Sequence, residues 1–186
     1  MSARILRNIN TEKRKVMKKY LLRGGLALLL VVSAFLLQNS ICRVIPFFKV
    51  APNILLIVTF SIGFLRGKVA GMMTGLLCGL LLDAFSGGVL GYYTLIFIYI
   101  GYFNGLLSRI LVNDMILLPL GLCLINEVCY SAYIYIFSIL LMGKSNLMDY
   151  IRTIALPELV MTFFCTIILY GVIMAGNRRL TASEKN

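Results

Sequence analysis

The segment TGLLCGLLLDAFSGGVLG, residues 74–91, combines an apolar run with glycines four residues apart and one aspartate, Asp83. A glycine inside a helix costs about 1 kcal/mol relative to alanine, and a charged side chain at the edge of hydrocarbon costs more. Both features therefore need a structural or functional reason.

The composition indicates an integral membrane protein. Of the 186 residues, 60% are hydrophobic and 13% are charged, and the mean hydropathy is +0.93. These values lie well outside the range of soluble globular domains. A bilayer core of roughly 30 Å requires about 20 mostly apolar residues per helix. We therefore predict an all-α integral membrane protein with six transmembrane helices, over residues 24–41, 51–65, 69–85, 89–112, 115–142 and 156–175.

The distribution of charge predicts how these helices are oriented. With both termini in the cytoplasm, all but four of the eighteen Lys and Arg residues fall on the cytoplasmic side, as the positive-inside rule requires. The chain then divides into a basic cytoplasmic tail (1–23), a six-helix transmembrane domain (24–176) and a short cytoplasmic tail (177–186). The net charge of +11 is explained by orientation and by attraction to anionic lipid headgroups, so we expect no nucleic-acid partner. The first span lacks a small-residue cleavage site and is expected to be retained.

The prolines predict where two of the helices begin or bend, and the cysteines bear on whether a metal or disulfide site is present. Pro52 and Asn53 are expected to begin a short second helix, and Pro119 is expected to bend the fifth helix or delay its start. The five cysteines show no CxxC spacing, and the chain has no histidine. We therefore expect no metal site, no disulfide framework, no catalytic residues and no cofactor.

The glycines form a row with a four-residue period. Steps of four residues advance about 400° around a helix, so the glycines drift by only about 40° each and form a slanting groove. Another helix backbone can lie close against such a groove. Internal packing against one of the protein's own helices is the preferred interpretation, and packing against a partner's helix is the alternative. The row comprises Gly63, Gly67, Gly71, Gly75 and Gly79, with a second pair at Gly101 and Gly105.

Three carboxylates lie within or at the edge of the apolar spans, where ionisable residues are functional candidates. Glu158 follows Pro157 and is expected to cap the first turn of the last helix. Glu127 lies near the middle of the fifth span beside Asn126. We expect it to be protonated or hydrogen-bonded to another helix, with Asn104 or a tyrosine hydroxyl as candidate partners.

Asp83 lies near the end of the third span, where its own helix dipole disfavours a negative charge. The sequence Ser-Gly-Gly at 86–88 reverses the chain within a few residues, and the fourth helix then presents unpaired N–H groups. We predict that the Asp83 carboxylate accepts them and ties the third and fourth helices into a hairpin.

The run GMMTGLLCGLLLDAFSGGVLGYYTL, residues 71–95, preceded by PNILL at 52–56 and LRGK at 65–68, resembles the MreD family of the bacterial rod-shape system. The Asn-Glu pair at 126–127 and the Leu-Pro at 156–157 also fit the family. Thr162 stands where an asparagine is expected. The residues that carry the resemblance, as a helix-packing or partner interface, are Gly71, Gly75, Gly79, Asp83, Gly87, Gly88 and Gly91.

The resemblance implies a non-enzymatic membrane scaffold of the cell-elongation machinery, involved in rod-shape determination and peripheral peptidoglycan synthesis. Its implied partners are an MreC-like bitopic membrane protein, MreB filaments, RodA and a class B penicillin-binding protein. It also implies a six-helix arrangement like that of the substrate-binding (S) subunits of energy-coupling factor transporters. Such a vitamin-transporter subunit is the alternative function, because the short second helix, the glycines and the buried carboxylate are general transporter features.

Overall fold

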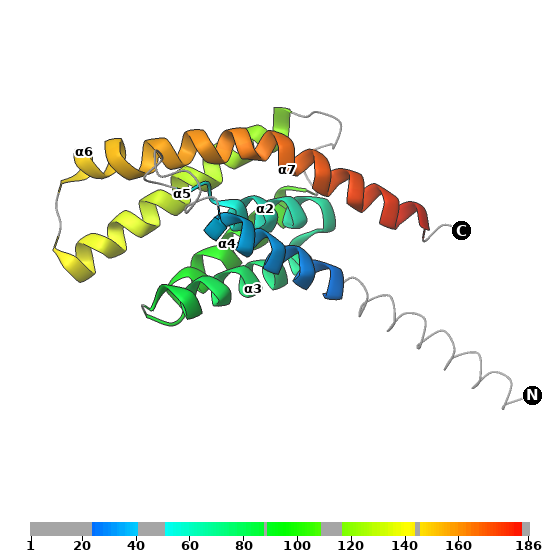
Figure 1. The fold of residues 1–186 in the computed structure, drawn as a ribbon, viewed down its shortest axis with the longest axis horizontal. Coiled ribbons are helices and arrows are strands. Elements are labelled where there is room, and N and C mark those ends of the chain that lie inside the picture. The colour runs from blue at the N-terminus through cyan, green and yellow to red at the C-terminus, as the bar shows by residue number, and fades with distance from the viewer. Residues whose placement is uncertain (1–23, 41–50, 88, 109–116, 144–145, 184–186) are drawn as a thin grey trace, which may run out of the picture.

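The computed structural model describes residues 24–40, 51–87, 89–108, 117–143 and 146–183. The regular structure in these residues is helical (Figure 1). Three helices are long and apolar enough to cross a membrane, and three shorter apolar helices accompany them. The expected all-α fold with six apolar helices is confirmed at this level. Some predicted features lie wholly or partly outside the described residues, namely the basic tail (1–23), Gly88, the end of the predicted span 89–112, the start of the predicted span 115–142 and the last residues of the predicted tail 177–186.

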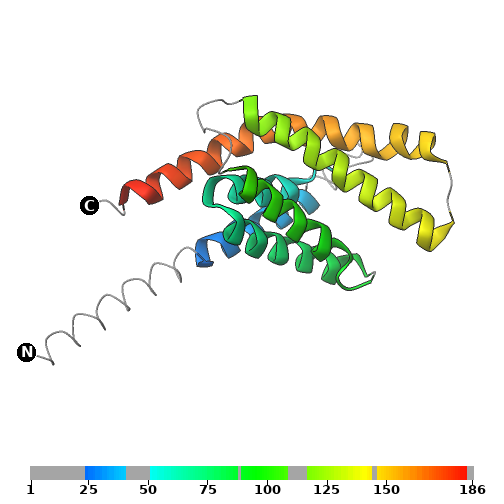
Figure 2. The same ribbon diagram turned by 180° about the vertical axis from the view of Figure 1, so that it is seen from behind.

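Successive helices run in alternating directions, except that α6, η1 and α7 continue one another in a single direction (Figure 1). The order is an N-terminal helix Gly24–Ser40, α2 Ile54–Arg66, α3 Lys68–Ser86, α4 Tyr92–Leu107, α5 Leu117–Met142, α6 Leu147–Tyr150, η1 Ile151–Ala155 and α7 Leu156–Ser183. The start of the N-terminal helix, the α2–α3 turn and the end of α7 lie at one end of the bundle, called here the Arg66 end (Figures 1 and 2). The α3–α4 turn and the end of α5 lie at the opposite end, called here the Asp83 end.

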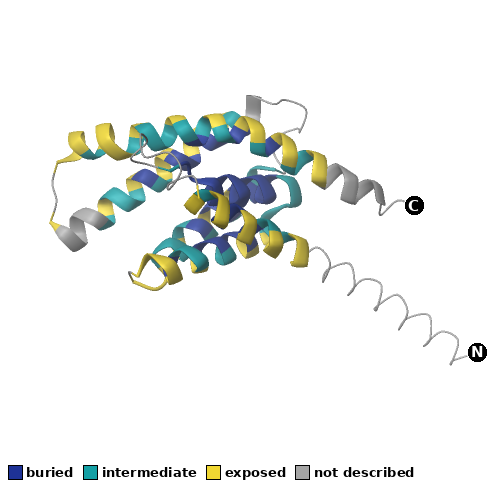
Figure 3. Ribbon diagram, viewed as in Figure 1, coloured by how far each residue is buried: buried dark blue, intermediate teal, exposed yellow. Residues whose placement is uncertain are grey.

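Helix α2 is the centre of the fold. Every residue from Ile54 to Phe64 is buried, and Figure 3 shows α2 as the most deeply buried helix. It contacts α3, α4, α5 and α7, and the N-terminal helix adds Val31, Ala34 and Phe35 to the same core. A helix that is apolar all round is stable only when neighbours surround it. Its shortness, and its start after Asn53, agree with the sequence-based prediction.

The glycines bring the backbones of α2, α3 and α4 into direct contact. A Cβ atom added to Gly63 would lie 2.7 Å from the carbonyl oxygen of Gly101. A Cβ at Gly75 would overlap the Phe97 carbonyl, and one at Gly79 would overlap the backbone of Thr94. The row therefore packs within the bundle. Gly67 is the exception, because it ends α2 with φ of 89° and has open space around it.

The last helix begins earlier than predicted. The sequence predicts a span over 156–175, but α6, η1 and α7 form a continuous helical segment from Leu147. Pro157 is the reason a helix was expected to begin here, because a proline has no N–H to donate and its ring crowds the carbonyl four residues earlier, that of Thr153. The wider π-helical turn Ile151–Ala155 accommodates the proline without ending the helix. At the other end α7 continues to Ser183, into the predicted tail 177–186.

The start of the fifth helix agrees with the effect expected of its proline. Helix α5 begins at Leu117, so Pro119 lies in its first turn, where a missing N–H leaves no hydrogen bond unmade.

Replacing Gly75 with alanine tests the backbone contact. Gly75→Ala should lower both membrane abundance and the thermal midpoint of the purified protein, because overpacking costs about 1–3 kcal/mol. Gly171→Ala in α7 is the matched control, since nothing lies within 4 Å of its added Cβ and alanine is the better helix former. Equal stability of the two variants would contradict internal packing of the glycine row.

Candidate functional site

The Asp83 carboxylate joins α3 to the start of α4. One of its oxygens accepts hydrogen bonds from the N–H groups of Gly91 (2.9 Å) and Thr94 (3.1 Å), and the Thr94 hydroxyl donates to the same oxygen. The other oxygen accepts the N–H of Tyr93 at 2.8 Å. Asp83 itself is only 2% exposed.

These contacts explain why a charged residue occurs here. The first N–H groups of a helix have no partner within it, and α4 has no side-chain cap of its own at Gly91. Asp83 supplies that cap from the preceding helix, where the positive end of the α4 dipole also favours its charge. The reversal uses left-handed backbone at Gly87 (φ 66°) and Gly91 (φ 97°), which glycine adopts without strain. The hydrogen bonds expected from the sequence are therefore present.

A tyrosine cluster, which sequence reasoning missed, joins α4 to α5 at the same end of the bundle. The Tyr133 hydroxyl donates to the Tyr92 carbonyl at 3.0 Å, and the Tyr92 hydroxyl donates to the Ile134 carbonyl at 3.4 Å. The rings of Tyr92, Tyr133 and Phe137 also pack against one another. The available signal was the density of aromatic residues at 92–93 and 133–137, but only tertiary structure pairs the two groups.

A reciprocal amide pair lies deeper in the bundle. Asn104 on α4 and Asn126 on α5 exchange two hydrogen bonds of 2.8 and 3.0 Å. Each amide also donates to a carbonyl one turn earlier in its own helix, at Ile100 and Leu122. Both side chains are buried, so the pair fixes the register between the two helices.

Glu127 does not have the expected partner. It is 1% exposed, and neither carboxyl oxygen has a hydrogen-bond partner within the described residues. Asn104, one of the two candidate partners, does not bond to Glu127, because its amide is taken up by Asn126, the residue next to Glu127. No described tyrosine hydroxyl reaches the carboxyl group either. A buried carboxyl group with no hydrogen-bond partner destabilises the fold, and it does so far more when it is ionised than when it is neutral.

Polar contacts also hold α7 against α5 and α2. The Cys123 thiol on α5 lies 3.0 Å from the Thr166 hydroxyl, which donates to the Thr162 carbonyl at 2.7 Å. The Thr162 hydroxyl accepts the N–H of Asn53 at 3.0 Å. Thr162, the position where an asparagine was expected, is therefore a fully buried contact between α7 and the start of α2.

The buried start of α2 has its N–H groups satisfied by three elements. The Gln38 side chain of the N-terminal helix accepts the Leu55 N–H at 3.1 Å, and the Asn53 side chain accepts the Leu56 N–H at 3.2 Å. Thr162 completes the set from α7. A helix end inside an apolar domain requires such partners because water cannot supply them.

Glu158 lies in the first turn of α7, as the sequence predicts, but α6 and η1 lead into that turn without a break. The helical segment begins at Leu147, so Glu158 lies well inside it rather than at a free N-terminus. The carbonyl groups of the preceding turns are available to the N–H groups around Glu158, and no local end of the dipole remains for its charge to meet. Glu158 is partly buried.

Comparison with protein families shows to which family a chain with these helix contacts belongs. The family model described as rod shape-determining protein MreD matches residues 18–176. The chain belongs to the MreD family. No curated protein and no solved structure matches it. The resemblance seen in residues 71–95 is thus confirmed, and the transporter-subunit alternative is set aside. The family has a role in rod-shape determination that is not catalytic. The likeness to transporter S subunits stays a prediction.

The chemistry of the described residues is that of helix connection. They contain no group of three His, Cys, Asp or Glu side chains placed to hold a metal ion. Asp83, the Asn104–Asn126 pair and Thr162 each bond two different helices. In an apolar medium such bonds specify which helices pair and in what register.

Substitutions at Asp83 test the connection between α3 and α4. Asp83→Asn should keep part of the hydrogen bonding and lower the thermal midpoint moderately, since one amide oxygen remains as an acceptor. Asp83→Leu should lower it further, because four donors lose an acceptor and bonds to a charged group contribute about 1.5–3 kcal/mol each. Asp149→Asn, at an exposed position, is the control. A leucine variant as stable as this control would refute the role of Asp83.

Proposed function

We propose that the protein is a non-enzymatic membrane scaffold of the bacterial cell-elongation machinery, acting in peripheral peptidoglycan synthesis. Its proposed partners are an MreC-like bitopic membrane protein and, directly or through it, MreB filaments, RodA and a class B penicillin-binding protein. The observation that carries this proposal is the match to the MreD family over residues 18–176. The use of the buried polar groups for helix connection supports it.

The proposed topology is multi-pass in the plasma membrane, with both termini in the cytoplasm. The start of the N-terminal helix and the end of α7 share the Arg66 end of the bundle (Figure 1), which supports an even number of crossings. Arg66 and Lys68 flank the α2–α3 turn at that end. Positive charge favours the cytoplasmic side, so the Asp83 end is expected to face outward.

A cysteine introduced at either end of the last helical segment tests this topology. In intact cells, a membrane-impermeant thiol reagent should label Ser145→Cys, in the connection before α6, above the background of the native cysteines. It should leave Thr181→Cys, near the end of α7, at background. Labelling of Thr181→Cys alone would reverse the proposed orientation, and labelling of both would place the two ends of the last helical segment on the same side of the membrane.

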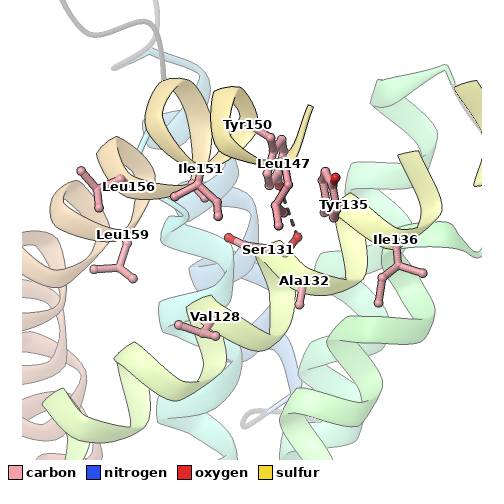
Figure 4. A pocket seen from close by; sticks show the side chains of 11 residues that line it. Val128, Ser131, Ala132, Tyr135, Ile136, Leu147, Tyr150, Ile151, Leu156 and Leu159 are labelled. Atoms are coloured by element: carbon pink, nitrogen blue, oxygen red, sulfur yellow. Dashed lines mark hydrogen bonds between the residues drawn. The ribbon is translucent and has the colours of Figure 1, made fainter. Parts of the chain in front are cut away.

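We propose that a groove between α5 and the α6–η1–α7 segment receives the partner's transmembrane helix. The groove has a volume of about 510 Å³, and side chains from the two helical segments face each other across it (Figure 4). Its lining includes three small residues, Ser131, Ala132 and Ala155. Small residues let a neighbouring helix approach closely.

The polarity of the groove supports an apolar occupant. The Tyr150 hydroxyl donates to the Ser131 carbonyl at 3.4 Å, the bond drawn in Figure 4, so it is not directed at a ligand. Val128 and Leu156 on the two sides of the groove are 56% and 58% exposed. The glycine row is already occupied by α4. The groove therefore offers a helix a surface that internal packing has left open.

Filling the groove tests the scaffold. Ala132→Phe should reduce co-purification with the MreC-like partner about tenfold while membrane abundance persists, since a clash of about 1–3 kcal/mol at the interface has that effect. Ile168→Phe is the matched control, because Ile168 is a 70% exposed apolar residue of α7 that does not line this groove. Unchanged co-purification in Ala132→Phe would exclude the groove as the binding surface.

A further inference from the structure

The outer face of α4 carries a row of exposed side chains. The exposed residues of this helix are Leu95, Tyr99 and Phe103, and we call them the α4 stripe. Their four-residue spacing places them on one side of the helix. The rings of Tyr99 and Phe103 stack with their centroids 6.4 Å apart, and the Tyr102 ring packs edge-on against Phe103. The α4 stripe is therefore apolar and largely aromatic, with one hydroxyl group.

The other sides of α4 are covered by the bundle. Gly101 and Gly105 lie against the backbone of α3, and Asn104 bonds to α5. No residue of α4 lines the groove between α5 and the α6–η1–α7 segment. None lines a second groove of about 450 Å³ between the N-terminal helix, α2 and α7 either. The α4 stripe is thus a surface separate from the one proposed for the partner's helix.

Tyr99 lies at an unusual depth for an exposed tyrosine. It is near the middle of α4, about 10–12 Å from either end of the helix at about 1.5 Å per residue. Tyrosines that face lipid are enriched at the membrane–water interface, where the hydroxyl group reaches water. Among the exposed large hydrophobic side chains of the described residues, Tyr99 alone carries a hydroxyl group, and it is 54% exposed. Lipid chains are therefore a poor match for this position.

The Tyr99 hydroxyl has no hydrogen-bond partner in the part of the chain that the structure describes. By contrast, the hydroxyls of Tyr92, Tyr133 and Tyr150 donate to backbone carbonyls. A hydroxyl group without a hydrogen bond is unfavourable in an apolar medium, and lipid chains offer it no acceptor. A well-matched occupant of the α4 stripe therefore has a hydrogen-bonding group at the depth of Tyr99.

We propose that the α4 stripe is the contact between two copies of this chain, with the two Tyr99 hydroxyls hydrogen-bonded to each other. Copies inserted in the same orientation are related by a twofold axis parallel to the membrane normal, so residues near this axis meet their own counterparts. A hydroxyl group both donates and accepts, so Tyr99 satisfies itself in this arrangement. The stripe carries no charge that would repel its copy, and aromatic rings pack favourably against one another.

The dimer leaves the groove between α5 and the α6–η1–α7 segment open in both copies, because α4 does not line it. If that groove holds a partner's transmembrane helix, as proposed above, the dimer brings two such helices into one assembly. This consequence rests on the proposed scaffold function, whereas the contact between the two α4 helices does not. Experiments on the chain without its partners therefore test the contact by itself.

The first test measures association of the purified full chain in phosphatidylcholine liposomes. Chains carrying a donor or an acceptor fluorophore at the N-terminus are mixed, and energy transfer is followed as the protein-to-lipid ratio is lowered. Tyr99→Phe, which removes only the hydroxyl, should raise the dimer dissociation constant about threefold to twentyfold, the effect of losing one hydrogen bond between membrane helices. Tyr135→Phe, which removes a hydroxyl from α5, is the matched control and should leave the constant unchanged. A chain that is monomeric at all ratios, or a Tyr99→Phe variant that dimerises as the control does, would overturn the proposal.

The second test identifies the neighbour of Tyr99 in native membranes. Tyr99→p-benzoylphenylalanine should give, on irradiation, an adduct with twice the mass of one chain. Ile168→p-benzoylphenylalanine, on the exposed face of α7, is the control and should give adducts with lipid. Adducts of the Tyr99 variant with a different protein would assign the stripe to a heterologous partner, and adducts with lipid alone would leave it facing the bilayer. Either result would overturn the proposal. If the bulky side chain at position 99 prevents folding, the same substitution at Leu95 gives the same readout.

Discussion

Direct contact between helix backbones is the constraint on which the rest of this structure depends. Gly71, Gly75 and Gly79 of α3 lie against the backbone of α4, and Gly63 of α2 lies against Gly101. Lipid chains are as apolar as leucine, so the hydrophobic effect contributes little to the association of these helices. Close packing between the backbones contributes the favourable van der Waals contacts instead. It also draws α2 into the bundle, where α3 and α4 cover one side and α5 and α7 cover others.

Burying α2 on every side creates a second requirement, because its first N–H groups cannot reach water. Gln38 of the N-terminal helix, Asn53 at the N-cap of α2 itself and Thr162 of α7 meet this requirement. Asp83 does the same for α4, and the Asn104–Asn126 pair joins α4 to α5. Each of these polar side chains therefore acts as a connector at a defined depth. Glu127 and Ser61 do not, since the Glu127 carboxyl oxygens and the Ser61 hydroxyl have no partner among the described residues.

The same packing decides which surfaces remain for other molecules. The glycine faces of α3 and α4 are used internally, so they cannot also receive a partner. The two described grooves are both bordered by the last helical segment, one with α5 and one with the N-terminal helix and α2. They lie toward opposite ends of that segment, and one is bordered by small residues while the other ends at Arg66.

The sequence by itself determined the features whose partners are close along the chain. Hydropathy was sufficient for the apolar helices, and the four-residue glycine period was sufficient for a close helix contact. Asp83 could be assigned to the start of α4 because only a short glycine turn separates the two, so few other hydrogen-bond donors lie within reach of the carboxylate. The residues 71–95 also identified the family, which the match over residues 18–176 confirmed.

Only the tertiary structure decided contacts between segments that are distant in the sequence. The sequence analysis named Asn104 as a candidate partner of Glu127, but the rotation of α5 about its axis brings Asn126, one residue earlier, to Asn104 instead. The contact of Thr162 with Asn53 spans 109 positions, and no local pattern encodes it. The helical path through Pro157 was missed because a π-helical turn relieves a clash that usually ends a helix. Helical periodicity specifies which side chains share a face, whereas the neighbour that each face meets depends on how all the helices pack together.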